Sequence, residues 1–473
     1  MFWNMAIGIA LSSAAATGTE VTIYNQGFGL IKESRQFELK QGRQTVSVED
    51  VASMIEPSSV GIRSLTDPNS FEVLEQNYQF DLINPLAILN KSVGQRIRFI
   101  RTIGSQKDVL EGILMSSPTA IVGSADGGSQ QTYNGMVIKT DDGRIVLNPT
   151  GEVEVKSIPD GLISKPTLLW DLNATKAGSN SVELSYLTQG INWNADYVFT
   201  LNGDKDGDLK GWVTVNNQSG ATFTDAKMKL LAGDVARVQP PRGRGFGGGA
   251  ADMAMMKSEA GFAEESLFEY HLYTLQRPAS IRNKEIKQLS LLEGKGVKYE
   301  KKLVIDALRG FGVYYPNEGQ VGIGNIKPLV LVEFVNSKEN GLGMPLPQGK
   351  VKVYQRDKSG SVQMLGEDQI DHTPKDEKLT LAVGRSFDVV ASRKRTNFRR
   401  ISDRVVEETF EIEVRNRKET PETVYVMERK WGDWEVLSKT MAFDKLDSTT
   451  MQFTLKLKAG EVQKVTYTVR TTW

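Results

Sequence analysis

The chain of 473 residues contains no cysteine and only two histidines, His271 and His372. Without cysteine it can form no disulfide, no thiol nucleophile, no thiolate metal site and no lipid anchor attached through a cysteine. Two imidazoles also leave little material for metal binding or acid–base catalysis. Any catalytic chemistry would therefore depend on carboxylates or on the segment around His372.

The chain also lacks a net charge and long apolar runs. Its 58 Lys and Arg residues balance 58 Asp and Glu residues, so no overall field attracts nucleic acid, and we expect no nucleic-acid partner. No run approaches the ~18 apolar residues of a membrane-spanning helix, so we expect no transmembrane span in the mature chain. The 39% of hydrophobic residues is enough to fill the cores of several domains.

The first residues have the pattern of a secretory signal peptide. A short apolar run, Met5–Leu11, is followed by Ala14–Ala16, which fits an Ala-x-Ala cleavage signature. We therefore predict a signal peptide over residues 1–16 and an exported protein, located in the periplasm, at the cell surface or outside the cell. Because Met1–Asn4 contains no Lys or Arg, a first buried strand or a misplaced start codon is the alternative.

Alternation of apolar and polar residues dominates the rest of the chain and predicts an all-β protein. In Thr409–Arg415, for example, Phe410, Ile412 and Val414 share one face while charged residues occupy the other. The expected architecture is a series of tandem antiparallel β-sandwich units.

The spacing of turns divides the chain into four β units. We predict an N-terminal β unit (17–80), a short helix with a small SH3- or Sm-like barrel (81–160), a central β-sandwich (161–385) and a C-terminal immunoglobulin-like sandwich (386–473). The helix is expected over Asp81–Lys91, with Asp81 as its cap, and a hairpin turn at Asp141–Gly143. Residues 239–266, rich in Gly and Met, are predicted to form a disordered loop within the central unit.

Four segments carry a resemblance to a known family: LISKPTLLWDL at Leu162–Leu172, Ser185–Val198, Gly211–Val235, and Val332–Tyr354 with GLGMPLPQGKVKVY. The chain resembles the bacterial domain-of-unknown-function family four-one-three-nine, whose relatives include mucoidy-inhibitor A-like proteins. The resemblance extends from about residue 160 to the end; the chain departs from the mucoidy-inhibitor branch, which has coiled-coil inserts, in having the barrel-like segment 93–157. It implies an exported, β-rich protein of the cell envelope and supplies no catalytic residues.

One acidic segment is similar to the start of a calcium loop. Asp204, Asp206 and Asp208 alternate around glycines, as oxygen ligands do in a tight Ca²⁺-binding turn. The twelfth position, counted from Asn202, is Val213 instead of the bidentate Glu of an EF-hand. A polar hairpin between two strands is the simpler interpretation, so calcium is the one cofactor that we consider.

A second polar cluster contains one of the two histidines. Glu367, Asp368, Asp371 and His372 could provide a His–carboxylate metal site or an acid–base pair. We favour a solvated connection between strands, because neighbouring residues of a strand point to opposite faces and no second histidine lies nearby in the sequence.

Aromatic and basic residues suggest binding surfaces. Trp193, Trp212, Trp431 and Trp434 could stack against sugars, although tryptophan more often fills cores. The basic run over 393–404 could bind a phosphate-rich glycolipid or nucleic acid, but we expect it to pair with the acidic residues of 407–413 across two strands.

These observations favour a non-enzymatic, exported envelope protein with a structural or interaction role, whose partner is an envelope protein or polysaccharide. The alternatives are a carbohydrate-binding module that uses exposed tryptophans and a hydrolase that uses two carboxylates. A cleft that gathers carboxylates from different strands would favour the hydrolase, and a row of exposed tryptophans would favour sugar binding.

Overall fold

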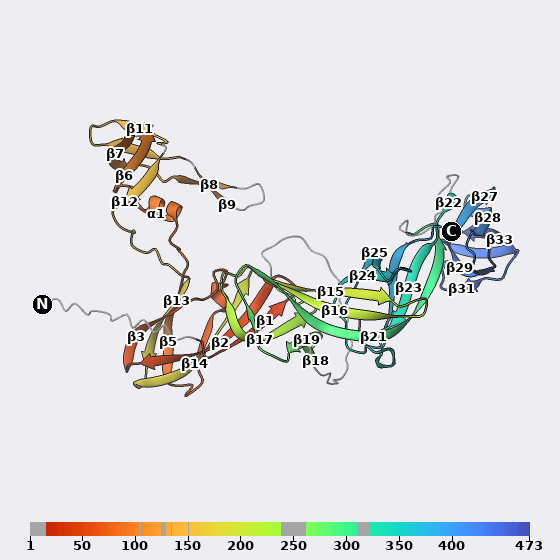
Figure 1. Ribbon diagram of the computed structural model, residues 1–473, viewed down its shortest axis with the longest axis horizontal. Coiled ribbons are helices and arrows are strands. Elements are labelled where there is room, and N and C mark those ends of the chain that lie inside the picture. The colour runs from red at the N-terminus through yellow and green to blue at the C-terminus, as the bar shows by residue number, and fades with distance from the viewer. Residues whose placement is uncertain are drawn as a thin grey trace.

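The computed structural model describes residues 16–103, 106–123, 129–133, 135–149, 151–237, 262–309 and 322–473. Within these ranges the chain forms strands, one α-helix and two short 3-10 helices, Pro57–Ser59 and Lys338–Asn340, which confirms the all-β prediction. The predicted signal peptide lies outside the described residues except for Ala16. Figure 1 shows an elongated molecule in which one small unit stands away from the main body.

Two sheets form the N-terminal end of the body. The larger sheet contains β1 (Gly18–Tyr24), β2 (Phe28–Leu39), β4 (Gly61–Ser64), β14 (Gly178–Gln189), β17 (Phe223–Ala232), β18 (Phe262–Leu267), β19 (Tyr270–Leu275) and β20 (Ala279–Ile281). The smaller sheet contains β3 (Gly42–Glu49), β5 (Phe71–Gln79) and β13 (Thr167–Ala174). Strands of the predicted N-terminal unit thus pair with strands of the predicted central unit. Both sheets contain strands from both of these units.

The last five residues of the predicted loop over 239–266 belong to a strand. Residues 238–261 lie outside the described residues, but Phe262–Leu267 form β18, which pairs with β19. The assignment of 262–266 to the loop was therefore wrong. Phe262, the first residue of β18, is 2% exposed. Burial of its ring stabilises the start of this strand.

The small unit is inserted between β5 and β13, which pair with each other (Figure 1). It contains α1 (Pro85–Lys91), β6 (Arg96–Ile103), β7 (Gln106–Leu114), β8 (Thr119–Gly123), β9 (Ser129–Tyr133), β10 (Val137–Thr140), β11 (Ile145–Leu147) and β12 (Glu152–Val155). Its main sheet has the order β11-β10-β7-β6-β12, with β12 returning to the first strand. The edge strands β11 and β12 share no ladder in the described part of the chain, so closure of the predicted barrel is not observed.

Two local predictions for this unit have different outcomes. The hairpin at Asp141–Gly143 is confirmed, because β10 and β11 pair on either side of it and Gly143 has φ +85°. The helix cap was wrong: Asn84, not Asp81, accepts a hydrogen bond from the Ala87 N–H, at 2.9 Å. Pro85 starts the helix at its first turn, so the capping residue is the one directly before it.

The middle of the body is a ten-stranded sheet. It contains β15 (Ile191–Leu201), β16 (Asp206–Asn217), β21 (Glu285–Asp306), β23 (Leu329–Val335), β24 (Gly349–Arg356), β25 (Val362–Ile370), β26 (Lys378–Arg385), β29 (Glu422–Arg429), β31 (Asp444–Lys445) and β32 (Thr450–Leu457). The 22-residue strand β21 pairs with β16 through its first half and with β23 and β29 through its second half. This single strand therefore connects the middle of the molecule to its C-terminal end (Figure 1).

The C-terminal end is a sandwich of two sheets. One is the part of the ten-stranded sheet that contains β29 and β32. The other contains β22 (Gly324–Ile326), β27 (Val389–Ser402), β28 (Val405–Asn416), β30 (Asp433–Lys439) and β33 (Val462–Thr472). Alternating residues of β28, such as Phe410, Ile412 and Val414, are fully buried in the core between the sheets. Pairing is mostly antiparallel, as predicted, but β1–β17, β15–β24 and β21–β29 are parallel. No helix in the described ranges is long and apolar enough to cross a membrane.

Candidate functional site

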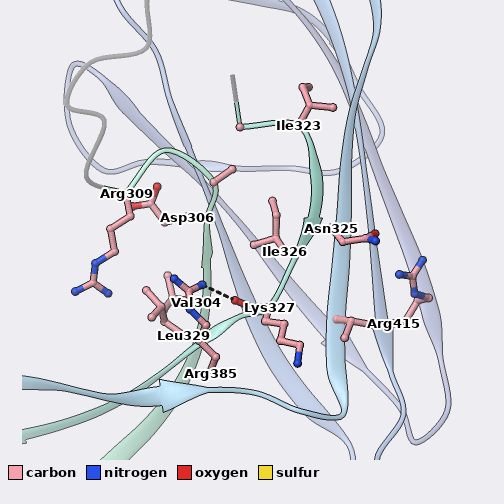
Figure 2. A pocket seen from close by; sticks show the side chains of 13 residues that line it. Val304, Asp306, Arg309, Ile323, Asn325, Ile326, Lys327, Leu329, Arg385 and Arg415 are labelled. Atoms are coloured by element: carbon pink, nitrogen blue, oxygen red, sulfur yellow. Dashed lines mark hydrogen bonds between the residues drawn. The ribbon is translucent and has the colours of Figure 1, made fainter. Parts of the chain in front are cut away.

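A pocket of about 770 Å³ lies where the middle sheet meets the C-terminal sandwich. Its walls come from the end of β21, from β22, and from the neighbouring ends of β23, β26, β27 and β28 (Figure 2). The volume is in the range of pockets that hold small molecules, which is ~300–1,000 Å³. We therefore consider this pocket the candidate functional site.

The pocket has an excess of positive charge. The described lining residues include four cations, Arg309, Lys327, Arg385 and Arg415, and one acid, Asp306. Asp306 accepts a hydrogen bond from Arg429 at 2.8 Å, so its charge is already compensated. In a chain with no net charge, this local excess favours an anion.

The cations differ in how far they are already engaged. Arg415 donates to Glu413 at 2.8 Å, whereas no carboxylate of the described residues forms an ion pair with Arg309, Lys327 or Arg385. Arg385 donates one hydrogen bond to the backbone carbonyl of Lys327 at 3.3 Å, which holds the Arg385 side chain beside Lys327 at one edge of the pocket (Figure 2). Three exposed cations are therefore available to a ligand.

The interior of the pocket is apolar. Ile323 and Ile326 pack on the buried core of the C-terminal sandwich and also line the pocket, together with Val304, Leu329 and Val390. Figure 2 shows Ile326 near the centre, between the walls formed by Arg309 and Asn325. The lining thus combines apolar side chains with a cationic edge.

A buried salt bridge supports one wall of the pocket. Arg393 of β27 is 0% exposed and donates to both carboxylate oxygens of Glu428, each at 2.8 Å. Its remaining nitrogen Nη1 donates to the Gly322 carbonyl, in the pocket wall, at 3.1 Å. Gly322 has φ +69°, and a Cβ there would lie 2.9 Å from the Leu308 side chain, so glycine is required.

Two further groups complete this buried cluster. Tyr467 donates a hydrogen bond to Glu428, and Lys430 lies 3.5 Å from the same carboxylate and 4.3 Å from the centre of the Phe410 ring. Burial would raise the pKa of Glu428, but the charges of Arg393 and Lys430 lower it to about 2. Burial lowers the pKa of Lys430 to about 8, although Glu428 opposes this shift.

The predicted calcium ligands occupy a hairpin. Asp204 lies in the turn between β15 and β16, and Asp206 begins β16. The Asp208 side chain accepts a hydrogen bond from the Gly296 N–H at 3.0 Å, which lowers its pKa. Within the described ranges no three His, Asp or Glu side chains are grouped as a metal ion would require. Calcium binding stays an untested prediction.

The side chains of the predicted polar cluster have different partners. Glu367 lies 3.6 Å from Lys350, whereas Asp368 accepts a hydrogen bond from the Ala382 N–H of β26 at 2.6 Å. The Asp371 carbonyl accepts a hydrogen bond from the Thr373 hydroxyl at 2.8 Å. Asp368 therefore links β25 to β26 and is engaged in structure, which fits the interpretation of this segment as a connection between strands.

His372 lies near the other histidine, which the sequence did not indicate. Its Nδ1 accepts a hydrogen bond from the Gln348 N–H at 3.1 Å, so this nitrogen is unprotonated. Burial lowers the pKa of His372, the charge of Asp234 opposes this shift, and His271 adds to it. His271 in turn contacts Glu264 at 2.7 Å. The statement that no second histidine lies nearby holds along the sequence but not in space.

The four candidate tryptophans do not form one exposed surface. Trp193 is 3% exposed and donates to the Leu231 carbonyl, while Trp212 is 38% exposed on β16. Trp431 and Trp434 are half-buried, and Trp434 contacts the side chains of Phe443 and Lys445. Trp193 is a core residue, as the alternative interpretation predicted.

The predicted pairing of the basic and acidic segments is confirmed. β27 and β28 are antiparallel neighbours, and Arg399 donates to Glu407 while Arg395 donates to Glu408 at 2.9 Å. Arg393 departs from this pattern because it turns into the core toward Glu428 of β29.

The pocket residues were missed by the sequence analysis. Arg309, Lys327, Arg385 and Arg415 are separated by up to 106 residues and belong to no recognisable motif. A comparison with models of known protein families and a search of curated proteins found no match for this chain. The geometry of the pocket is therefore the main guide to function.

Proposed function

We propose that this chain is an exported, non-enzymatic binding protein of the bacterial cell envelope, and that it holds an anionic ligand in the pocket at the junction of the middle sheet and the C-terminal sandwich. The observation that carries this proposal is that three exposed cations, Arg309, Lys327 and Arg385, line the pocket without an ion pair to any carboxylate of the described residues. Guanidinium and ammonium groups donate strong, charge-assisted hydrogen bonds to phosphate and carboxylate oxygens.

The envelope part of the proposal rests on the sequence. The signal-like residues 1–16 support export, and the motifs between about residue 160 and the C-terminus support membership of domain-of-unknown-function family four-one-three-nine. The partner expected from this location is a protein or polysaccharide of the envelope that carries negative charge.

Binding fits the pocket better than hydrolysis does. A carboxylate-dependent hydrolase needs two acids about 5–10 Å apart. The described lining contains one carboxylate, Asp306, and Arg429 holds it in an ion pair. Sugar stacking is also less favoured, since Trp193 is buried and no tryptophan is among the described residues that line the pocket.

Titration calorimetry with inorganic phosphate tests the binding part of this proposal. We expect saturable binding that weakens with salt and becomes at least about tenfold weaker in the double variant Lys327→Gln/Arg385→Gln. The matched control is Arg277→Gln, an exposed arginine outside the pocket lining, which should bind like the wild type. Equal binding by the double variant and the wild type would contradict the proposed site.

Cell fractionation and sequencing of the mature N-terminus test the location. A mature chain that begins near Thr17 and fractionates with the envelope supports export. A cytoplasmic chain that begins at Met1 would overturn this part of the proposal.

A further inference from the structure

We infer that the ligand of the junction pocket is an anionic amphiphile: a phosphate head group that carries an alkyl chain. This inference rests on the proposed function and specifies its ligand. A small inorganic anion would need only the cationic edge, but the pocket also has an apolar interior.

The lining of the pocket is divided into a cationic part and an apolar part. Arg385 and Lys327 lie at one edge, where they are joined by the 3.3 Å hydrogen bond from Arg385 to the Lys327 carbonyl (Figure 2). Ile323 and Ile326, backed by the core of the C-terminal sandwich, line the adjoining interior. An anionic head at the edge would thus place an attached chain against apolar side chains.

An exposed aromatic residue, Phe387, follows β26 next to this edge. Its ring is 82% exposed, an unusual state for so large an apolar side chain. The Lys327 ammonium lies 5.3 Å from the ring centre. Phe387 is therefore placed beside the cationic group, where it can cover the part of an alkyl chain that is nearest the head group.

The size of the pocket also favours a ligand larger than an inorganic anion. A volume of about 770 Å³ exceeds what a phosphate ion occupies and suits a ligand of drug-like size. The charges exclude the opposite kind of amphiphile, because a cationic head group would meet the four cations of the lining and one acid already paired with Arg429.

Calorimetry with three soluble probes tests the inference: hexyl phosphate, inorganic phosphate and hexyltrimethylammonium. We expect hexyl phosphate to bind at least about tenfold more tightly than phosphate, because each fully buried methylene group contributes roughly a factor of four. Hexyltrimethylammonium, with the same chain and the opposite charge, should not bind.

Variants assign the effect to the pocket. Phe387→Asn and Ile326→Ser should each reduce the advantage of hexyl phosphate over phosphate and leave phosphate binding nearly unchanged. Phe268→Asn is the matched control, because Phe268 is also 82% exposed but lies between β18 and β19. Phe387→Asn changes only an exposed side chain, so it stays informative if Ile326→Ser, which alters a side chain packed on the core, fails to fold.

The outcomes separate this inference from the proposed function. Equal affinities for hexyl phosphate and phosphate, both lost in Lys327→Gln/Arg385→Gln, would overturn the amphiphile and leave the anion site standing. Absence of binding by all three probes would overturn both. Sedimentation with phosphatidylglycerol vesicles identifies the source of a confirmed ligand: Arg385-dependent sedimentation indicates a lipid within a bilayer, and binding of hexyl phosphate alone indicates a free amphiphile.

Discussion

Arg393 and Glu428 face each other in the core of the C-terminal sandwich, joined by two hydrogen bonds of 2.8 Å. Both side chains are almost fully buried, and the Arg393 guanidinium also stacks 4.0 Å from the centre of the Phe410 ring. The same guanidinium donates to the carbonyl of Gly322 in the wall of the pocket. One buried ion pair thus connects the stability of the sandwich to the shape of the candidate site.

Glu428→Gln should strongly destabilise the protein. The substitution keeps the size of the side chain but removes the negative charge that compensates Arg393, and breaking a buried pair from one side costs about 3–5 kcal/mol. The measurement is the free energy of unfolding from urea denaturation. Glu419→Gln, at an exposed position, is the control and should change this free energy by less than about 0.5 kcal/mol. A similar small effect of both substitutions would show that the buried pair contributes little.

Lys430→Met should remove a specific pH dependence of stability. The pKa of Lys430 is about 8 in the folded protein and ~10.4 in an unfolded chain, so between these values the unfolded chain binds more protons. Raising the pH from 7 to 9.5 should therefore stabilise the wild type relative to Lys430→Met by about 2 kcal/mol. Parallel urea denaturation of both proteins measures this difference. Burial also raises the pKa of Tyr467, but the effect of this tyrosine on stability appears only above pH ~10 and is the same in both proteins. A difference that is independent of pH would contradict the prediction.

The architecture could be predicted from the sequence where it depends on neighbouring residues. Alternation identified most strands, and the opposite charges of 393–404 and 407–413 indicated the pairing of β27 with β28. The first sheet could not be foreseen in this way, because β1 pairs with β2 locally but also with β17, about 200 residues later. Such distant pairings depend on the packing of the whole core.

The candidate site is harder to predict for the same reason. Lys327 and Arg385 lie 58 residues apart, and only the ends of β22 and β26 bring them to one edge. Arg393 belongs to a basic run that the sequence pairs with the acidic residues of 407–413, yet its side chain points inward to Glu428 and is completely buried. Nothing in the neighbouring sequence distinguishes an arginine of such a run that lies on the surface from one that is buried in the core.

His372→Asn should reduce the loss of stability in mild acid. The pKa of His372 is lowered in the folded protein, so as the pH falls through ~6.5 the unfolded chain binds the proton first and gains stability relative to the fold. Asparagine cannot titrate, and its oxygen can still accept the hydrogen bond that Gln348 donates. Urea denaturation between pH 5 and 7.5 should show a shallower decline for the variant, whereas equal declines would contradict the assignment of the acid sensitivity to His372.

Replacement of residues 84–161 by a short Gly-Ser linker should leave the body of the molecule folded. The inserted unit has its own core, which includes Phe99 and Ile138, and the chain enters and leaves it at adjacent points: the Ile83 N–H donates to the Ile163 carbonyl at 2.9 Å. Strands β5 and β13 would still pair, because the replaced residues lie outside both strands and the Trp170 indole N–H would still donate to Gln76, at 2.9 Å in the full chain. The melting temperature of the shortened chain should lie within about 5 °C of that of the body in the full chain. A shortened chain that does not fold would show that the body depends on contacts with the inserted unit.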